Sequence, residues 1–189
     1  AHALADRLVV ETPDTRLNAA AAVLPAALDG LWYPPVFRHG AMLWNNRYPG
    51  WRTVFGGTVL DWPERVLAQA EFYCGHQVTS KRHRSHATDP IPLHALPAQG
   101  SRFYGRGRIL EDQGVYNMQS QFFDQLIHAW RWTGDEFLAA RLRPALELHL
   151  EWLRECFDPY HDGLYESFIN TWPSDSVWYA GCAGTEKTA

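Results

Sequence analysis

The sequence predicts an all-α protein built from helical hairpins, and three observations indicate this class. Long segments, such as residues 113–132, place apolar residues at helical spacing. No segment shows the sustained alternation of apolar and polar residues that marks a half-buried strand. The connecting stretches are rich in aromatic residues, proline and glycine. We expect these long aromatic loops to gather at one end of the hairpins and to carry the chemistry.

Composition limits the function classes. A chain of 189 residues is long enough for one domain with a substantial core, so residues 1–189 are taken as a single domain. The formal net charge of −4 gives no electrostatic reason to expect nucleic acid or an anionic membrane surface as a partner. No apolar run reaches membrane-spanning length. Nine tryptophans favour a ligand-lined cleft over a plain helical scaffold.

The first half of the chain predicts two helices. Asn18 is the expected cap of an Ala-rich helix that ends near Leu28, with Pro25 kinking or splitting it. An aromatic loop then covers residues 31–51. Asp61 is the expected N-cap of a second helix that runs to about Val78, because proline and glutamate follow at favourable positions. Its expected inward residues are Val66, Leu67, Ala70, Tyr73 and Cys74.

The second half predicts two longer helices after a polar stretch, residues 80–107, that is either a functional loop or locally disordered. A helix over residues 113–132 has the core stripe Val115, Met118, Phe122, Leu126 and Trp130. Gly134 ends it, and Asp135 caps a helix through Phe157 in which Pro144 introduces a kink. The inward residues expected in that last helix are Leu138, Leu142, Ala145, Leu146, His149, Trp152, Leu153 and Cys156.

The stretch 162–179 is the most informative for function. It opens with an Asp-Gly turn and sets two acids, Glu166 and Asp175, among aromatic residues. Trp and Tyr rings suit the faces and hydroxyl rims of sugars, and nearby carboxyl groups can protonate a glycosidic oxygen or activate water. The alternative is a surface loop whose tryptophans cover the ends of neighbouring helices.

Three segments together resemble a known group. Residues 50–57 (Gly-Trp-Arg-Thr-Val-Phe-Gly-Gly), residues 111–124 and residues 162–178 are similar to stretches of six-hairpin glycosidases. These are the (α/α) toroid hydrolases, akin to glucoamylases, trehalases, processing α-glucosidases and bile-acid β-glucosidases. The likeness covers about residues 12–181 and is greatest to uncharacterised bacterial members linked to polysaccharide degradation. It implies an (α/α) six-hairpin toroid, of which this chain has the length of only a part, and self-association through the exposed toroid edge.

The resemblance also implies catalytic carboxyl groups. Asp175 takes the place of the general acid, and burial beside Trp172 and Trp178 would raise its pKa. Glu111 takes the place of the nucleophile or base, a role that Asp112 could hold instead. The alternatives are a helix cap for Asp175 and acids at a helix N-terminus for Glu111 and Asp112. The expected substrate-binding residues are Trp44, Arg47, Trp51, Arg52, Gln113, Asn117, Glu166, Trp172, Trp178 and Tyr179.

Arg47 and Arg52 add a hint about the substrate. Arginine binds carboxylates through two parallel hydrogen bonds, so a uronic acid would explain both residues. The alternative is a pair of arginines stacked on aromatic rings or bonded to loop carbonyls. Glu166 is expected to hold its loop by accepting backbone N–H bonds.

Metal and cofactor chemistry is not expected. His83 and His86 lack acids at ligand spacing, and His128 and His149 fall inside helices, where a core or surface role is the better interpretation. The three cysteines show no metal-like spacing; reduced, buried thiols are expected, with one disulfide as the alternative. Localisation stays open, with a periplasmic or secreted protein slightly favoured.

The sequence therefore predicts a glycoside hydrolase acting on a polysaccharide or oligosaccharide, with carbohydrate as its partner and no cofactor. One alternative is a polysaccharide lyase or sugar epimerase on a similar toroid, using Tyr116, Tyr179, Arg52 and His128. The other is a truncated chain that binds glycans without catalysis or is inactive.

Overall fold

The computed structural model describes residues 4, 6, 8–40, 47–80, 106–110, 116–158, 160–163, 165–167 and 186–188. Over this part of the chain the protein is mostly helical, in agreement with the predicted all-α class. The helices are α2 (Thr15–Asp29), α3 (Thr53–Val59), α4 (Pro63–Gly75), α6 (Tyr116–Thr133) and α7 (Glu136–Phe157). Four short strands, β1 (Trp32–Tyr33), β2 (Val36–Phe37), β3 (Tyr165–Ser167) and β4 (Glu186–Thr188), form two antiparallel pairs.

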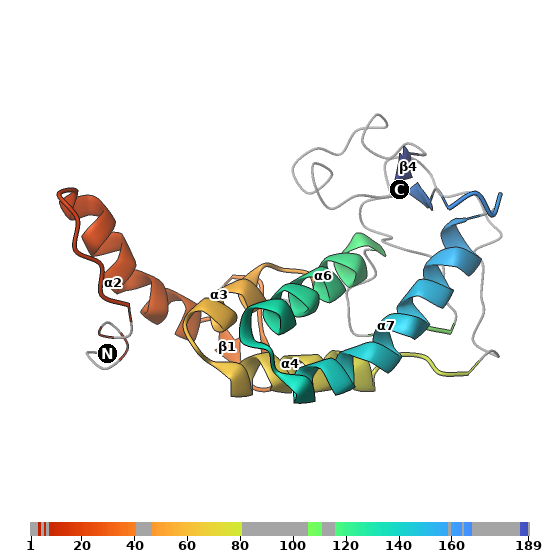
Figure 1. Cartoon of the computed structure of the whole chain (residues 1–189), viewed down its shortest axis with the longest axis horizontal. Helices are drawn as coiled ribbons and strands as arrows, with labels where there is room; N and C mark the ends of the chain where they lie inside the picture. Colours follow the sequence, from red (N-terminus) through yellow and green to blue (C-terminus); the bar gives the residue numbers. More distant parts are fainter. Residues whose placement is uncertain are drawn as a thin grey trace.

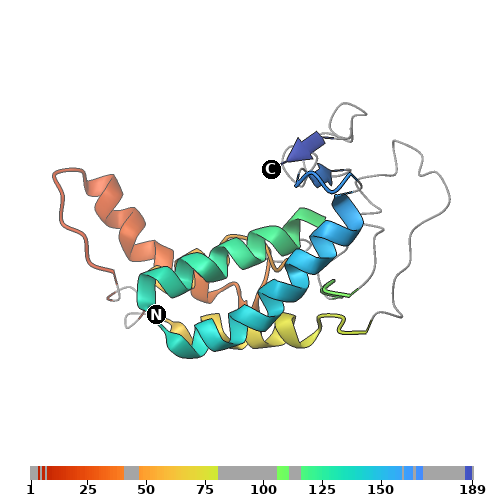
Figure 2. The ribbon, with the colours of Figure 1, turned by 45° about the vertical axis from the view of Figure 1, so that its right-hand side comes forward.

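The helices α3, α4, α6 and α7 pack together, whereas α2 extends away from them (Figures 1 and 2). The turns between α3 and α4 and between α6 and α7 are short, and both lie at the same end of the group. A small recess at this end is lined by Thr58, Asp61, Pro63, Val66, Leu67, Ala129, Thr133, Asp135 and Leu138. The long connections therefore leave from the opposite end, which we call the loop end.

The hairpin of α6 and α7 forms as the sequence predicts. Gly134 adopts a φ of +67°, which only glycine takes without strain, and its N–H donates to the carbonyl of Trp130. The Asp135 side chain then accepts hydrogen bonds from the N–H groups of Phe137 and Leu138, at 2.9 and 3.2 Å. These two residues end one helix and begin the next, as expected.

The main core lies between α3, α4, α6 and α7. Its buried apolar members are Val36, Val54, Val66, Ala70, Tyr73, Ile109, Phe122, Phe123, Leu126, Ala129, Leu138, Leu142 and Ala145. Most inward residues predicted for α4, α6 and α7 are among them or at their edge. Val115 and the Cys156 side chain lie outside the described residues.

The predicted stripe on α6 is wrong at its last position. Trp130 is 38% exposed, and the preceding residue, Ala129, takes the core position. Each helical residue turns about 100°, so eleven residues from Met118 return almost to the same face, whereas twelve overshoot it by about 120°. The predicted stripe advances by four residues at each step after Met118, and this spacing places Trp130 outside the buried face.

Helix α2 begins earlier than predicted. Asp14, not Asn18, is its N-cap, and the Asp14 carboxylate accepts from the N–H of Arg16 at 2.8 Å. The side chain of Asn18 instead binds Thr12, accepting from its N–H at 2.9 Å and donating to its carbonyl at 3.0 Å. Pro25 lies inside the helix and does not split it, as Pro144 lies inside α7.

Helix α4 also begins differently. Trp62, not Asp61, is the N-cap, and its side chain makes no capping hydrogen bond. Asp61 adopts a φ of +55° in the turn that reverses the chain after α3. Arg65 explains part of this local order, because its guanidinium lies 4.2 Å from the Trp62 ring centroid and 2.6 Å from Asp29 of α2. The helix ends at Gly75, three residues before the predicted Val78.

Helix α3 was not predicted. Its sequence contains Gly56 and Gly57, which disfavour a helix, and β-branched residues. Packing overrides this weak propensity. A Cβ added at Gly56 would lie 2.7 Å from a methyl carbon of Leu28, and one at Gly57 would lie 3.2 Å from Val66. The two glycines therefore let α3 approach α2 and α4 closely.

Candidate functional site at the loop end

The N-terminus of α6 lies at the loop end, and the segment around Gly50 packs against it. Gly50 lies against it so closely that an added Cβ would come within 2.3 Å of the carbonyl oxygen of Met118. This contact places the segment containing Trp51 and Arg52 beside the first two turns of α6. Asn117 lies in the first of those turns. The expected binding residues Trp51, Arg52 and Asn117 thus come from segments that lie next to each other.

The His39 ring contacts two other rings in this region. The His39 ring meets the Trp51 ring edge-to-face, with centroids 3.9 Å apart, and meets the Tyr48 ring at 5.2 Å. All three side chains are half-buried. The sequence predicted only that the loop 31–51 is rich in aromatic residues. The structure shows that three of its rings form one group.

The arginines beside these rings partly agree with the alternative interpretation, in which they contact aromatic rings of the protein itself. The Arg47 guanidinium lies over the Phe72 ring near the end of α4, 5.3 Å from its centroid. Arg38 lies in the same way over Tyr33 at 4.7 Å. Arg52 is exposed at the start of α3. A cation–π contact therefore accounts for the position of Arg47, whereas Arg38 is not among the residues predicted from the sequence.

A buried polar network supports the loop end from beneath. Its central side chain is Gln119 of α6, which is fully buried. The Oε1 atom of Gln119 accepts from the N–H of Ile109 at 2.8 Å. Its Nε2 atom donates to the carbonyl of Gly107 at 2.6 Å and contacts Nδ1 of His149 at 3.0 Å. One side chain thus ties α6 and α7 to the segment 106–110.

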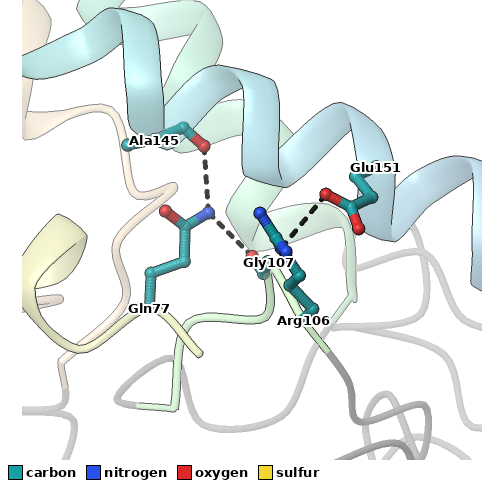
Figure 3. A network of polar contacts seen from close by, with 5 residues as sticks. All are labelled: Gln77, Arg106, Gly107, Ala145 and Glu151. Atoms are coloured by element: carbon teal, nitrogen blue, oxygen red, sulfur yellow. Dashed lines mark hydrogen bonds and ion pairs between the residues drawn. The ribbon is translucent and has the colours of Figure 1, made fainter. Parts of the chain in front are cut away.

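Gln77 makes a second set of bonds to the same segment. Its Nε2 atom donates to the carbonyl of Gly107 at 2.8 Å and to that of Ala145 at 3.0 Å (Figure 3). Arg106 binds Glu151 of α7 at 3.1 Å on the other side of Gly107 (Figure 3). Backbone bonds between Val78 and both Gly107 and Arg108 close the two ends of the long connection together.

Gly107 is required at this point. It adopts a φ of +93°, and an added Cβ would overlap the carbonyl oxygen of Leu148 at 1.9 Å. The segment therefore lies directly against the backbone of α7. It emerges at Leu110, which is exposed and whose N–H donates to the carbonyl of His76. The predicted acids Glu111 and Asp112 follow immediately in the sequence.

The protonation of His149 follows from its neighbours. The N–H of Ile109 can only donate, so it identifies the oxygen of the Gln119 amide, and the amide nitrogen must face His149. Nδ1 of His149 therefore accepts, and the ring proton is on Nε2. Burial, and secondarily the positive charge of Arg108, lower the pKa of His149 to about 3. His149 is thus a neutral core histidine stacked on Phe123, consistent with the core interpretation.

Arg108 is the buried cation of this region. Only 1% of the residue is exposed, and its guanidinium lies 5.2 Å from the centroid of the Trp152 ring. Arg108 and the buried glutamines Gln69, Gln77 and Gln119 are core residues that the sequence did not predict. The available signal was a polar residue inside an apolar helical stripe, as Gln69 is in α4 and Gln119 in α6.

Several predicted site residues lie outside the described residues, namely Asp175, Glu111, Asp112, Trp44, Gln113, Trp172, Trp178 and Tyr179. Glu166 lies in β3, which pairs with β4 and contacts α7. Because α6 and α7 are antiparallel, the end of α7 and the start of α6 lie at the same end of the molecule. The structure therefore brings Arg47, Trp51, Arg52, Asn117 and Glu166 to the loop end.

Metal and membrane interpretations receive no support from the described part of the chain. No group of three or more His, Cys, Asp or Glu side chains there could hold a metal ion. His128 is exposed and lies 3.6 Å from Asp124 on the same helix. Among the described helices, none has the length and apolar character needed to cross a membrane. Cys74 is a free thiol, and burial raises its pKa to about 12.

Comparison of the chain with protein-family models, with curated proteins and with solved structures finds no match in any of the three. The resemblance to six-hairpin glycosidases therefore remains a prediction from the sequence.

Proposed function

We propose that the chain is a glycoside hydrolase that acts on a polysaccharide or oligosaccharide and that its helices form part of an (α/α) toroid. The observation that carries this proposal is that the segments of those predicted binding residues that the structure describes meet at the loop end. Gly50 places Trp51 and Arg52 against the first turns of α6, where Asn117 lies. Aromatic rings and arginines in one place are groups that bind sugars.

The support for the acids comes from the segment that precedes them. Glu111 and Asp112 follow a stretch whose backbone is held by Gln77, Gln119 and His76. A carboxyl group acts on a glycosidic bond only when its position is held within a fraction of an ångström. Buried hydrogen bonds hold residues 107–110 in this way, and Glu111 and Asp112 themselves lie outside the described residues. In the proposed mechanism Asp175 protonates the leaving oxygen and Glu111, or Asp112, acts from the other face of the sugar.

The arrangement of the helices is compatible with part of a toroid. Antiparallel helices joined by short turns at one end and by long connections at the other are the repeating unit of such a ring. The alternating end-to-end pattern of α3, α4, α6 and α7 has this form. The group would continue on both sides in a complete ring, with α2 as an outlying helix.

The lyase or epimerase alternative is less well supported. Proton abstraction needs a base and an arginine around a single sugar residue. Tyr116 and His128 are twelve residues apart on α6, about 18 Å along the helix axis. The two side chains therefore cannot act on the same proton, so this alternative would use only one of them as its base, and His128 is already paired with Asp124.

The test is the release of reducing sugar from a panel of neutral and uronic-acid glycans. Wild type is compared with Asp175→Asn and Glu111→Gln, each with a control that removes an exposed carboxylate elsewhere, Asp124→Asn and Glu147→Gln. We expect activity in the wild type and the controls and a loss of at least about a hundredfold in the two site variants. Circular dichroism confirms that all the proteins are folded. Activity that survives in both site variants would remove these carboxyl groups from the mechanism.

A further inference from the structure

Helix α2 carries an apolar face that packs on the other helices only at one end. Leu17, Ala21, Leu24 and Leu28 recur at spacings of three or four residues, so they share one face of the helix. Leu28 lies against Gly56 of α3, and from there α2 extends away from the other helices (Figures 1 and 2). Farther out, Leu24 and Leu17 are 57% and 58% exposed. We call these two exposed leucines the α2 stripe.

The composition of α2 is that of a helix covered by another surface. Residues 17–28 contain no charged side chain, and most alanines of the helix are exposed. A helix of this length without such packing is marginal in water, and Pro25 removes one of its hydrogen bonds. A helix without a charged face is normally buried on several sides. The leucines of the α2 stripe are therefore the place where a second surface would add most stability.

A matching apolar surface lies across α3 and α6. Phe55 of α3 meets His128 of α6, with ring centroids 5.8 Å apart. Both helices run from the loop end toward the short turns, so one turn farther on Val59 and Trp132 lie at the same level. Val59 is 61% exposed and Trp132 is 72% exposed. We call Phe55, His128, Val59 and Trp132 the α3–α6 strip.

A second copy of the chain is the partner that fits both surfaces. The strip begins beside the base of α2, because Phe55 precedes the glycine on which Leu28 packs. Since α2 extends away from its own strip, it is directed toward other molecules, and two-fold symmetry lets each copy cover the other. The exposed parts of the stripe and of the strip's three apolar residues amount to roughly 600 Å² per chain. Two copies therefore offer roughly 1,200 Å², the lower limit of a specific interface, before the alanines are counted.

We propose that the chain forms a two-fold symmetric dimer in which the α2 stripe of each copy packs on the α3–α6 strip of the other. Neither surface contains Asp, Glu, Lys or Arg, so the contact forms without removing these charges from water. The proposal is independent of the proposed hydrolase, because none of these residues is among its catalytic or substrate-binding residues.

Sedimentation equilibrium tests the dimer. Between about 1 and 100 µM, the wild type is expected at twice the 21.6 kDa of one chain, since interfaces near this size reach micromolar or tighter affinity. Leu24→Lys and Trp132→Glu each place a charge in the apolar contact and should weaken the dimer at least about a hundredfold. Leu110→Lys is the matched control, because Leu110 is 59% exposed at the loop end, and it should dimerise as wild type does. A wild type that stays a single chain, or a mass that rises past the dimer with concentration, would overturn the proposal.

Mixing the two variants tests which surfaces meet. In a dimer of Leu24→Lys with Trp132→Glu, one contact joins an unchanged stripe to an unchanged strip, and the other pairs the introduced lysine with the introduced glutamate. We expect the mixture to regain the dimer that each variant alone has lost, which misfolded variants could not do. Loss of the dimer in only one variant would mean that stripes pair with stripes or strips with strips. That result, or a mixture that stays monomeric, would refute the arrangement.

Discussion

Gly107 provides the sharpest test of the structural argument, because the position requires glycine for two separate reasons. Its φ of +93° would cost an alanine about 1–3 kcal/mol in backbone strain. In addition, the new Cβ would lie 1.9 Å from the carbonyl oxygen of Leu148 and 2.8 Å from Cβ of Trp152. Ordinary contact begins near 3.4 Å, so the segment or α7 has to move by about 1.5 Å.

That movement breaks the buried network around Gly107. The Gly107 carbonyl accepts from Gln77 and Gln119 at 2.8 and 2.6 Å, and both amides are buried. Each lost bond costs about 1 kcal/mol, and more where a buried amide is left without a partner. We therefore expect Gly107→Ala to lower the free energy of unfolding by about 4–6 kcal/mol. This is a large part of the stability of an ordinary domain.

Gly134→Ala is the matched control. Gly134 also has a positive φ, +67°, but nothing lies within 4 Å of its added Cβ, so only the strain of roughly 1 kcal/mol remains. The assay is urea unfolding of the two variants and wild type, followed by circular dichroism at 222 nm. Losses of stability within about 1 kcal/mol of each other would refute the claim that the segment 106–110 lies tightly against α7.

Three further predictions concern single side chains. Asp135→Ala should lower the free energy of unfolding by about 1–2 kcal/mol, because the N–H groups of Phe137 and Leu138 lose their acceptor. Asp124→Ala, which removes an exposed carboxylate, should change it by less than about 0.5 kcal/mol, and similar urea midpoints for the two variants would contradict the cap. His149 has a pKa of about 3 in the folded protein, below its unfolded value of 6.5. As the pH falls from 6.5 toward 3, the unfolded chain binds a proton there that the folded chain does not. This side chain therefore lowers stability by up to about 1.4 kcal/mol per pH unit in that window, and His149→Gln should show a shallower slope in urea titrations at several pH values. Identical slopes would exclude a neutral, buried His149. Cys74, with its pKa raised to about 12 by burial, should be alkylated by iodoacetamide at pH 8 far more slowly in the native protein than in urea. Peptide mass spectrometry measures this, and equal labelling rates would show that the thiol is accessible.

Local sequence signals were reliable where the structure depends on neighbouring residues. Gly134 and Asp135 predicted the end of one helix and the start of the next, because a positive φ and an N-cap are satisfied within a few residues. The apolar spacing of α6 and α7 predicted most of their buried faces for the same reason. Trp130 was assigned inward because steps of four residues drift around a helix, whereas the packed face of α6 continues through Ala129.

Propensity failed where packing overrode it. Two glycines argue against a helix at α3, but they are what allow α3 to approach Leu28 and Val66. Asp61 and Asn18 are good N-caps by residue type. However, Asp61 lies in the chain reversal after α3, and the side chain of Asn18 binds Thr12. A competing tertiary contact decided each case, and no local pattern reports such a contact.

The candidate site also has features that follow from the sequence and features that depend on tertiary contacts. The sequence by itself determined which residue types are present: the acids, aromatic rings and arginines that predict sugar chemistry, and the helices that carry some of them. Only the tertiary structure decided that Gly50 lies on α6, that His39 meets Trp51, and that Gln119 joins Ile109 to His149. These contacts link residues far apart in the chain, and their energies depend on burial and on a specific partner. They exist only once the helices have packed, because only then is water excluded from the amides and rings that form them.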